Sequence, residues 1–249
     1  MADPAEMRHR LSREAALVDA FVHLSDTLVD DYDIIDFLHF LTASCVGLVE
    51  IDEAAVMLAA PSGLLQAIAS STERSRMLEL FELQNHDGPC LDAYRGGLVV
   101  SAADLAEESG RWPTFAPRAL EVGFRAVHSV PLRLRDQVIG ALNLLRVAPG
   151  VLTDGDARLV RALSDIATVG VIQERTISAS HAATNGLQIA LNSRIRIEQA
   201  KGVLAERDGI SIDDAFETLR GYARRNRLGL SHVASEIVAG RLRLSSPDP

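Results

Sequence analysis

The residues near the C-terminus whose types could bind an anion are one lysine and a row of arginines. Lys201 is the only lysine in the 249 residues, and Arg220, Arg224 and Arg227 follow at spacings of four and three. Such spacings place side chains on one helix face, so the guanidinium groups would form a solvent-exposed ridge. Guanidinium groups grip phosphate oxygens and stack on unpaired bases. The pattern indicates a phosphate-binding face; the alternative is an ordinary solvated arginine face with Glu217 neutralising Arg220.

The charge of the chain is divided unevenly. Residues 1–183 contain 15 arginines against 26 acidic residues, a net charge of −11, whereas residues 184–249 carry ten basic and eight acidic residues, a net charge of +2. The acidic part would repel a polyanion, so any contact with nucleic acid should be confined to the tail.

Composition excludes several classes of protein. No apolar run reaches the roughly 18 residues of a membrane helix, and the amino terminus carries acids where a signal peptide has basic residues. We therefore expect a cytoplasmic protein without membrane contact. No Gly-rich phosphate loop follows a predicted strand, and no catalytic constellation is visible, so the sequence predicts a protein that is not an enzyme.

Three residues of the acidic part are candidates for a ligand pocket. Cys90 follows Gly-Pro in a predicted loop, Trp112 is the only tryptophan, and His128 lies at the edge of an apolar strand. Each also fits a plain structural role, as a small semi-buried thiol, a core ring and a satisfied core histidine. Cys45 and Cys90 are the only cysteines and are expected to be thiols. The sequence predicts no metal site and leaves any cofactor unknown.

The elements that must position these residues fall into two groups. Residues 1–150 mix helical and alternating patterns, which predicts an α+β fold with a mainly antiparallel sheet. Helices are expected over residues 11–28, 34–49, 73–84 and 113–122, strands over 54–60, 64–69, 98–101, 124–132 and 138–147, and a loop over 85–97. A long helix over residues 155 to about 175 follows, and then three tail helices are expected over residues 187–207, 212–227 and 232–242.

Two sets of motifs resemble known families. Residues 193–205, with Ile-Glu-Gln-Ala-Lys-Gly-Val-Leu-Ala, and Leu-Arg at 219–220 are similar to the ANTAR domain, an RNA-binding three-helix module of bacterial antitermination regulators. Gly-Pro-Cys-Leu-Asp-Ala at 88–93 and Ile-Gly-Ala-Leu-Asn-Leu at 139–144 resemble a GAF domain. The resemblance implies that Lys201, Arg194 and the arginine ridge bind RNA hairpins in nascent transcripts. It also implies a small-molecule ligand or pairing of copies for the GAF part.

The resemblance and the patterns divide the chain into four parts. We expect a GAF-like sensory domain with its flanking helices over residues 1–178, a joint over 179–186, the ANTAR domain over 187–243 and a disordered tail over 244–249. The predicted function is a signal-responsive RNA-binding antiterminator that acts as a homodimer. The long helix would carry the signal through the joint to the tail.

Two other functions stay open at this point. A DNA-binding regulator could use the last two helices as a helix-turn-helix, although the second of them has few polar residues at its start to read bases. A methionine sulfoxide reductase of GAF type could act through Cys45 and Cys90, since such chemistry needs a nucleophilic and a resolving thiol.

Overall fold

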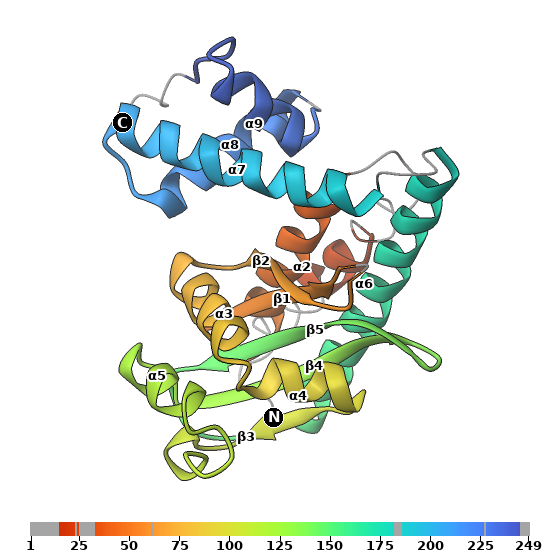
Figure 1. Ribbon diagram of the computed structural model, residues 1–249, viewed down its shortest axis with the longest axis vertical. Helices are drawn as coiled ribbons and strands as arrows, with labels where there is room; N and C mark the ends of the chain where they lie inside the picture. The colour runs from red at the N-terminus through yellow and green to blue at the C-terminus, as the bar shows by residue number, and fades with distance from the viewer. Residues whose placement is uncertain are drawn as a thin grey trace, which may run out of the picture.

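The structure of the chain is a computed structural model. It describes residues 15–22, 24, 33–60, 62–181, 186–226 and 228–244, with side chains outside residues 177–192. The prediction for Arg227 and most of the predicted disordered tail lie outside the described residues. In the described part of the chain, no helix is both long and apolar enough to cross a membrane. Figure 1 shows a sheet with covering helices and, above α2 and β2 in that view, a group of three helices.

A five-stranded antiparallel sheet forms the centre of the larger part. Its strands are ordered β2-β1-β5-β4-β3. The strand bounds are β1 Glu53–Ala59, β2 Leu65–Ser70, β3 Val100–Ala102, β4 Ala126–Leu134 and β5 Gln137–Arg146. Gly140 of β5 pairs with Leu58 of β1, and a Cβ at this position would clash with the Met57 carbonyl oxygen. Only glycine therefore permits this close approach of β1 and β5.

Two long helices cover one face of the sheet. They are α2 (Ile34–Leu48) and α6 (Asp154–His181). Asp33 caps α2, since its carboxylate accepts a hydrogen bond of 2.9 Å from the Ile35 N–H. Leu38 and Leu41 of α2 are fully buried together with Leu163 of α6. The helix that was predicted over residues 155 to about 175 continues in the structure to His181.

Three shorter helices cover the other face. They are α3 (Glu73–Asn85), α4 (Pro89–Gly96) and α5 (Phe115–Glu121), with a 3-10 turn at Leu105–Glu107. Buried Trp112, Phe115 and Phe124 fill the space between these helices and the sheet. The predicted loop over residues 85–97 is wrong in its second half, because Pro89 stands at the first position of α4. Proline is favoured there, since that N–H has no helical partner.

The three tail helices form a small bundle. They are α7 (Gly186–Asp208), α8 (Ile212–Asn226) and α9 (Leu230–Val238), close to the predicted ranges. Their shared core contains apolar residues with 0 to 3 % exposure: Ile197, Ala200, Leu204, Ala215, Leu219, Ala223, Leu230, Val233, Ala234 and Ile237. These residues belong to one continuous apolar cluster with α2, α6 and the sheet face beneath them. The bundle is therefore docked on the larger part through apolar contact as well as through charge.

Candidate functional site

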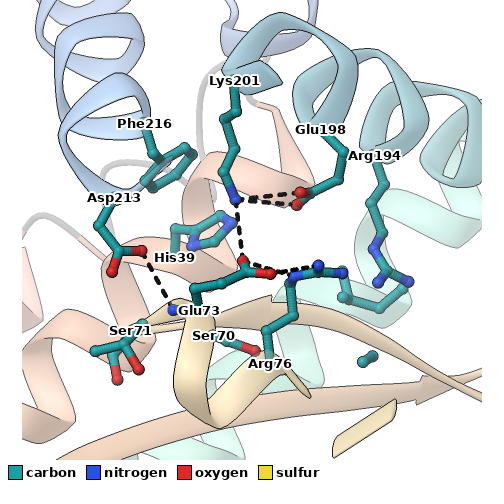
Figure 2. A pocket seen from close by; sticks show the side chains of 13 residues that line it. His39, Ser70, Ser71, Glu73, Arg76, Arg194, Glu198, Lys201, Asp213 and Phe216 are labelled. Atoms are coloured by element: carbon teal, nitrogen blue, oxygen red, sulfur yellow. Dashed lines mark hydrogen bonds and ion pairs between the residues drawn. The ribbon is translucent and has the colours of Figure 1, made fainter. Parts of the chain in front are cut away.

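Lys201 lies between the two parts of the protein. Its side chain is 8 % exposed, and its ammonium group is 3.2 Å from both carboxylate oxygens of Glu198. It also lies 3.8 Å from Glu73 Oε2 at the start of α3. In Figure 2 the ammonium group points away from α7 towards Glu73, across the boundary between the two parts. The only lysine of the chain is therefore held by one carboxylate of its own helix and one from the other part.

Arg220 is also enclosed, which corrects one prediction. Its Nε lies 3.3 Å from Asp36 Oδ1 on α2, and a terminal nitrogen lies 4.0 Å from Glu217 on its own helix. The side chain is 10 % exposed. The predicted solvent ridge is thus wrong for Arg220, because α2 covers this face of α8. Glu217 does take part, as its pattern indicated, but Asp36 is the nearer partner.

Two further aspartates connect the parts. Asp33, the cap of α2, accepts a hydrogen bond from the Ser231 N–H at 3.0 Å with the oxygen that does not cap its own helix, and a second from the Ser231 hydroxyl. Asp213 of α8 accepts a bond of 3.2 Å from the Glu73 N–H, at the start of α3. A carboxylate of the bundle thus binds at the N-terminus of α3. The partial positive charge of that helix end favours an anion there.

A pair of rings lies between these ion pairs. The rings of His39 on α2 and Phe216 on α8 have centroids 4.3 Å apart and are tilted by 45°. The Lys201 ammonium lies 5.6 Å from the centroid of the Phe216 ring. Burial lowers the pKa of His39 to about 3, and the positive charges of Arg220 and Lys201 add to the lowering. His39 is therefore a neutral ring in this arrangement.

The polar side chains surround a small cavity of about 30 Å³, shown in Figure 2. That volume is of the size of a single water molecule. Arg194 of α7 lines it together with Arg76 of α3, and Glu198 lies between Arg194 and Lys201. Burial lowers the pKa of Arg194, while Glu198 opposes the lowering. The cavity walls thus bring cations of the bundle close to acids of the larger part.

The remaining basic candidates lie in different surroundings. Arg224 of α8 is exposed and lines an open groove with Asp19 and α2. Arg194 is half-buried beside the cavity, and Arg227 lies outside the described residues. Of the five predicted anion-binding residues, the structure therefore brings Lys201, Arg220 and Arg194 together. It places Arg224 further along α8, facing the helix at residues 15–22.

The three candidates for a ligand pocket are not brought together. Cys90 and Trp112 are 0 and 1 % exposed in the apolar cluster beneath α3, α4 and α5, where the Trp112 N–H donates to Asp92 at 3.0 Å. His128 is half-buried and lies near Val151, with its Nδ1 bonded to the Ser101 hydroxyl. Because His128 follows Val127 of that cluster, the alternation of β4 turns it to the opposite face.

The buried cluster that contains Cys90 and Trp112 also contains two carboxylates. Glu79 and Glu82 of α3 are both fully buried, and the Asn143 amide donates to Glu79 at 2.7 Å and to Glu82 at 3.4 Å. Burial raises the pKa of Glu79 to about 7, and burial together with the charge of Glu79 raises that of Glu82 well above its usual value. Among the described residues, no group of three or more His, Cys, Asp or Glu could hold a metal ion.

The two thiols are unsuited to exchange with each other. Cys45 is buried in the cluster under α2, and Cys90 in the cluster on the other face of the sheet. Burial raises the pKa of Cys45 to about 12. Burial raises the pKa of Cys90 as well, and the charges of Glu79 and Glu82 add to this effect. A thiolate is the reactive form, so both environments disfavour thiol chemistry.

The sequence patterns missed the acidic half of the interface. Asp33, Asp36, His39 and Glu73 all come from the larger part, and none of them was a candidate in the sequence. Asp33 could be read as a helix cap, and the others as polar positions of amphipathic helices. Nothing in helical spacing tells which distant element will cover a polar face.

The structure thus consists of an antiparallel α+β domain and a small helical bundle that is docked on it through complementary charges. A GAF domain model matches residues 33–171, and an ANTAR domain model matches residues 185–238. The chain therefore belongs to the GAF domain family and carries an ANTAR domain behind the GAF domain. GAF is a signal-sensing domain, and ANTAR is an RNA-binding antitermination domain.

Solved structures agree with the fold of the larger part. The GAF domain of a phosphoenolpyruvate-protein phosphotransferase from Coxiella burnetii has 10 % identity and a TM-score of 0.52, covering 66 % of this chain and 98 % of that chain. The free methionine-R-sulfoxide reductase from Neisseria meningitidis has 16 % identity and a TM-score of 0.50, covering 65 % and 91 %. These likenesses concern the fold alone. No curated protein sequence matches the chain.

Proposed function

We propose that the protein is a signal-responsive antiterminator that binds stem-loops in nascent RNA through its ANTAR domain. The observation that carries this proposal is the grouping of Lys201, Arg220 and Arg194 on one side of the bundle. Three cations on adjacent helices can bind successive phosphates of an RNA backbone. A hairpin held in this way would be unavailable for pairing into a terminator.

The arrangement described above would be the inactive form. Lys201 and Arg220 have 8 and 10 % of their side chains exposed, and they face Glu73 and Asp36 of the GAF domain. RNA cannot reach these cations while the carboxylates hold them. A signal would activate the protein by favouring a form in which the bundle has moved away, in proportion to its differential affinity for the two forms.

The contacts favour a direct route for the signal. Glu73 begins α3, and α3 carries the buried Glu79 and Glu82 on the face of the sheet where Cys90 and Trp112 are packed. A ligand or modification that shifted α3 would move Glu73 and the N–H that binds Asp213. The sequence predicted that the long helix would carry the signal through the joint to the tail. The direct route does not require α6 to do so.

A homodimer is part of the proposal. Val18 and Val22 in the helical residues 15–22 and Val169 on α6 are 56, 53 and 47 % exposed. A second copy of the chain would bury these side chains, and burial of apolar surface favours association. Light scattering at micromolar concentration, with and without RNA, measures the oligomeric state directly, and a monomer in both would remove the dimer from the proposal.

The test is binding of the full chain to RNA hairpins with a fixed stem and a randomised unpaired loop, with duplex DNA of the same stem sequence as the competitor. We expect selected hairpins to bind in preference to the duplex. The double variant Lys201→Ala/Arg220→Ala should bind more weakly, with a salt slope of log K reduced by about 0.7–0.9 for each lost phosphate contact.

The matched control removes two positive charges elsewhere. Arg118 and Arg161 of the GAF domain have side chains that are 43 and 72 % exposed. Each forms an ion pair with an acidic residue one turn further along its own helix. The double variant Arg118→Ala/Arg161→Ala should leave the affinity and the salt slope unchanged. Equal binding by the Lys201/Arg220 variant and the wild type would overturn the assignment, and preference for the DNA duplex would favour a DNA-binding regulator.

A further inference from the structure

The position of Phe216 differs from that of a core residue. Its neighbour Ala215 is fully buried within the bundle, whereas Phe216 is half-buried even with the GAF domain in place. Consecutive residues of a helix point about 100° apart, so Phe216 projects from the bundle towards α2. Its ring would be an exposed aromatic surface if the GAF domain moved away.

Cations surround this ring. Lys201 lies 5.6 Å from its centroid. Arg220 is four residues further along α8, on the same side of the helix, and Arg194 lines the same cavity as Phe216. An aromatic ring flanked by cations is the combination with which proteins bind an unpaired nucleotide, since the ring stacks on the base and the cations hold the adjoining phosphates.

The GAF domain presents matching groups to each part of this surface. The flat, neutral ring of His39 lies against Phe216 at 4.3 Å between centroids. The carboxylates of Asp36 and Glu73 lie against Arg220 and Lys201. The GAF domain thus places a ring against the Phe216 ring and carboxylates against the cations. A bound nucleotide would place its base and its phosphates in the same positions.

We propose that Phe216 is the stacking platform for an unpaired base of the RNA loop, and that His39 occupies the place of that base when the two domains are closed. The inference rests on the proposed function and adds a specificity-determining residue to it. The bound chemistry is one nucleobase in an RNA loop, with the phosphates on either side of it.

The variants on the two sides of the ring pair should act in opposite directions. His39→Ala weakens the closed form and leaves the RNA-binding surface intact, so it should raise the affinity for a selected hairpin. Phe216→Leu also weakens the closed form but removes the platform, so it should lower the affinity. If Phe216 serves only as an interface residue, both substitutions should raise the affinity.

The contribution of Phe216 to RNA affinity is measured in a variant whose interface between the two domains is already weakened. In the full chain with His39→Ala, adding Phe216→Leu should reduce the affinity about 5- to 150-fold, the range of ~1–3 kcal/mol for a base stacked on an aromatic side chain. Phe216→Tyr, which keeps the ring, should restore most of the affinity. Thermal unfolding of each variant shows that the bundle remains folded.

An altered RNA completes the experiment. Each loop position of the selected hairpin is replaced in turn by an abasic nucleotide or by 2-aminopurine. At one position the abasic RNA should bind weakly and Phe216→Leu should cause no further loss, while 2-aminopurine there should lose fluorescence on binding the ring-bearing variants only.

The outcomes separate this inference from the proposed function. Tight hairpin binding that is unaffected by Phe216→Leu, or a loss that is equal for every abasic RNA, would overturn the stacking platform and leave the function standing. No hairpin binding by either the wild type or His39→Ala would overturn both.

Discussion

Asp36 is the nearest acidic partner of Arg220, and it belongs to the other domain. Asp36→Asn keeps the size of the side chain and removes its charge, which leaves Arg220 with Glu217 at 4.0 Å. Because the Asp36 side chain is 36 % exposed, solvent weakens the pair, and we expect hairpin affinity to rise about two- to fivefold, or ~0.4–1 kcal/mol. Filter binding with the selected hairpin measures this change.

The control for this substitution is Asp165→Asn on α6, whose carboxylate is 62 % exposed and 3.9 Å from Arg161. It removes the same charge from the GAF domain without touching the bundle, so it should leave the affinity unchanged. A fall in affinity for Asp36→Asn would contradict the proposal that Asp36 competes with RNA for Arg220.

The ring of His39 makes the closed form sensitive to acid. Its pKa is about 3 in the closed form and 6.5 for an ordinary histidine. The closed form therefore binds fewer protons, so its stability relative to the open form is fully present above pH 6.5 and is lost as the pH falls below that value. The charged groups that face the ring and its surroundings are Arg194, Glu198, Lys201, Asp213, Arg220, Asp36, Glu73 and Arg76.

We expect hairpin affinity to increase as the pH is lowered from 7.5 to 5.5, by up to about tenfold for each pH unit below 6.5. His39→Gln cannot take up the proton and should bind with an affinity that varies little over this range. The pKa of Glu73 is lowered by Arg76 and Lys201 against the effect of burial, so Glu73 remains ionised there. An identical pH profile for His39→Gln and the wild type would assign the effect to another group.

At the scale of elements, helical and alternating periods predicted the sheet and the three tail helices to within a few residues. They could do so because the apolar faces of α2, α7 and α8 meet their own cores, and the period reports that burial. The same periods missed α4, whose eight residues are too few for a clear pattern. They also made Arg220 a solvated residue, because a polar face that another domain will cover has the pattern of one that water will cover.

The connection between α6 and α7 offers a test of the route of the signal. A flexible Gly-Ser segment inserted after Ser180, at the end of α6, lengthens the connection to α7 but leaves the contacts of Asp36 and Glu73 with the bundle available. Lengthening a linker lowers effective concentration only gradually. We expect Asp36→Asn to raise hairpin affinity by nearly the same factor with and without the insertion. Loss of that difference on insertion would favour transmission through the helix, which is the route expected from the sequence alone.

At the scale of the whole molecule, the uneven charge has a structural counterpart. Residues 1–183, which include the GAF domain, have a net charge of −11, and they supply Asp33, Asp36 and Glu73 to the basic bundle. The sequence predicted the two parts and the sign of the net charge of each. It could not predict how the two parts dock, because docking depends on which faces of separately folded parts fit together. That information is spread over residues up to about two hundred positions apart.

Because Lys201 is the only lysine, the rate of its chemical modification reports whether the two domains are closed. Apart from the α-amino group, Lys201 is the only primary amine in the chain, and its side chain is 8 % exposed. An acylating reagent should therefore modify Lys201 slowly in the closed form, at a rate set by the fraction of molecules that are open. Peptide mass spectrometry would give this rate relative to that of the α-amino group. Asp36→Asn should accelerate Lys201 acylation by about the factor by which it raises RNA affinity, without any RNA in the sample.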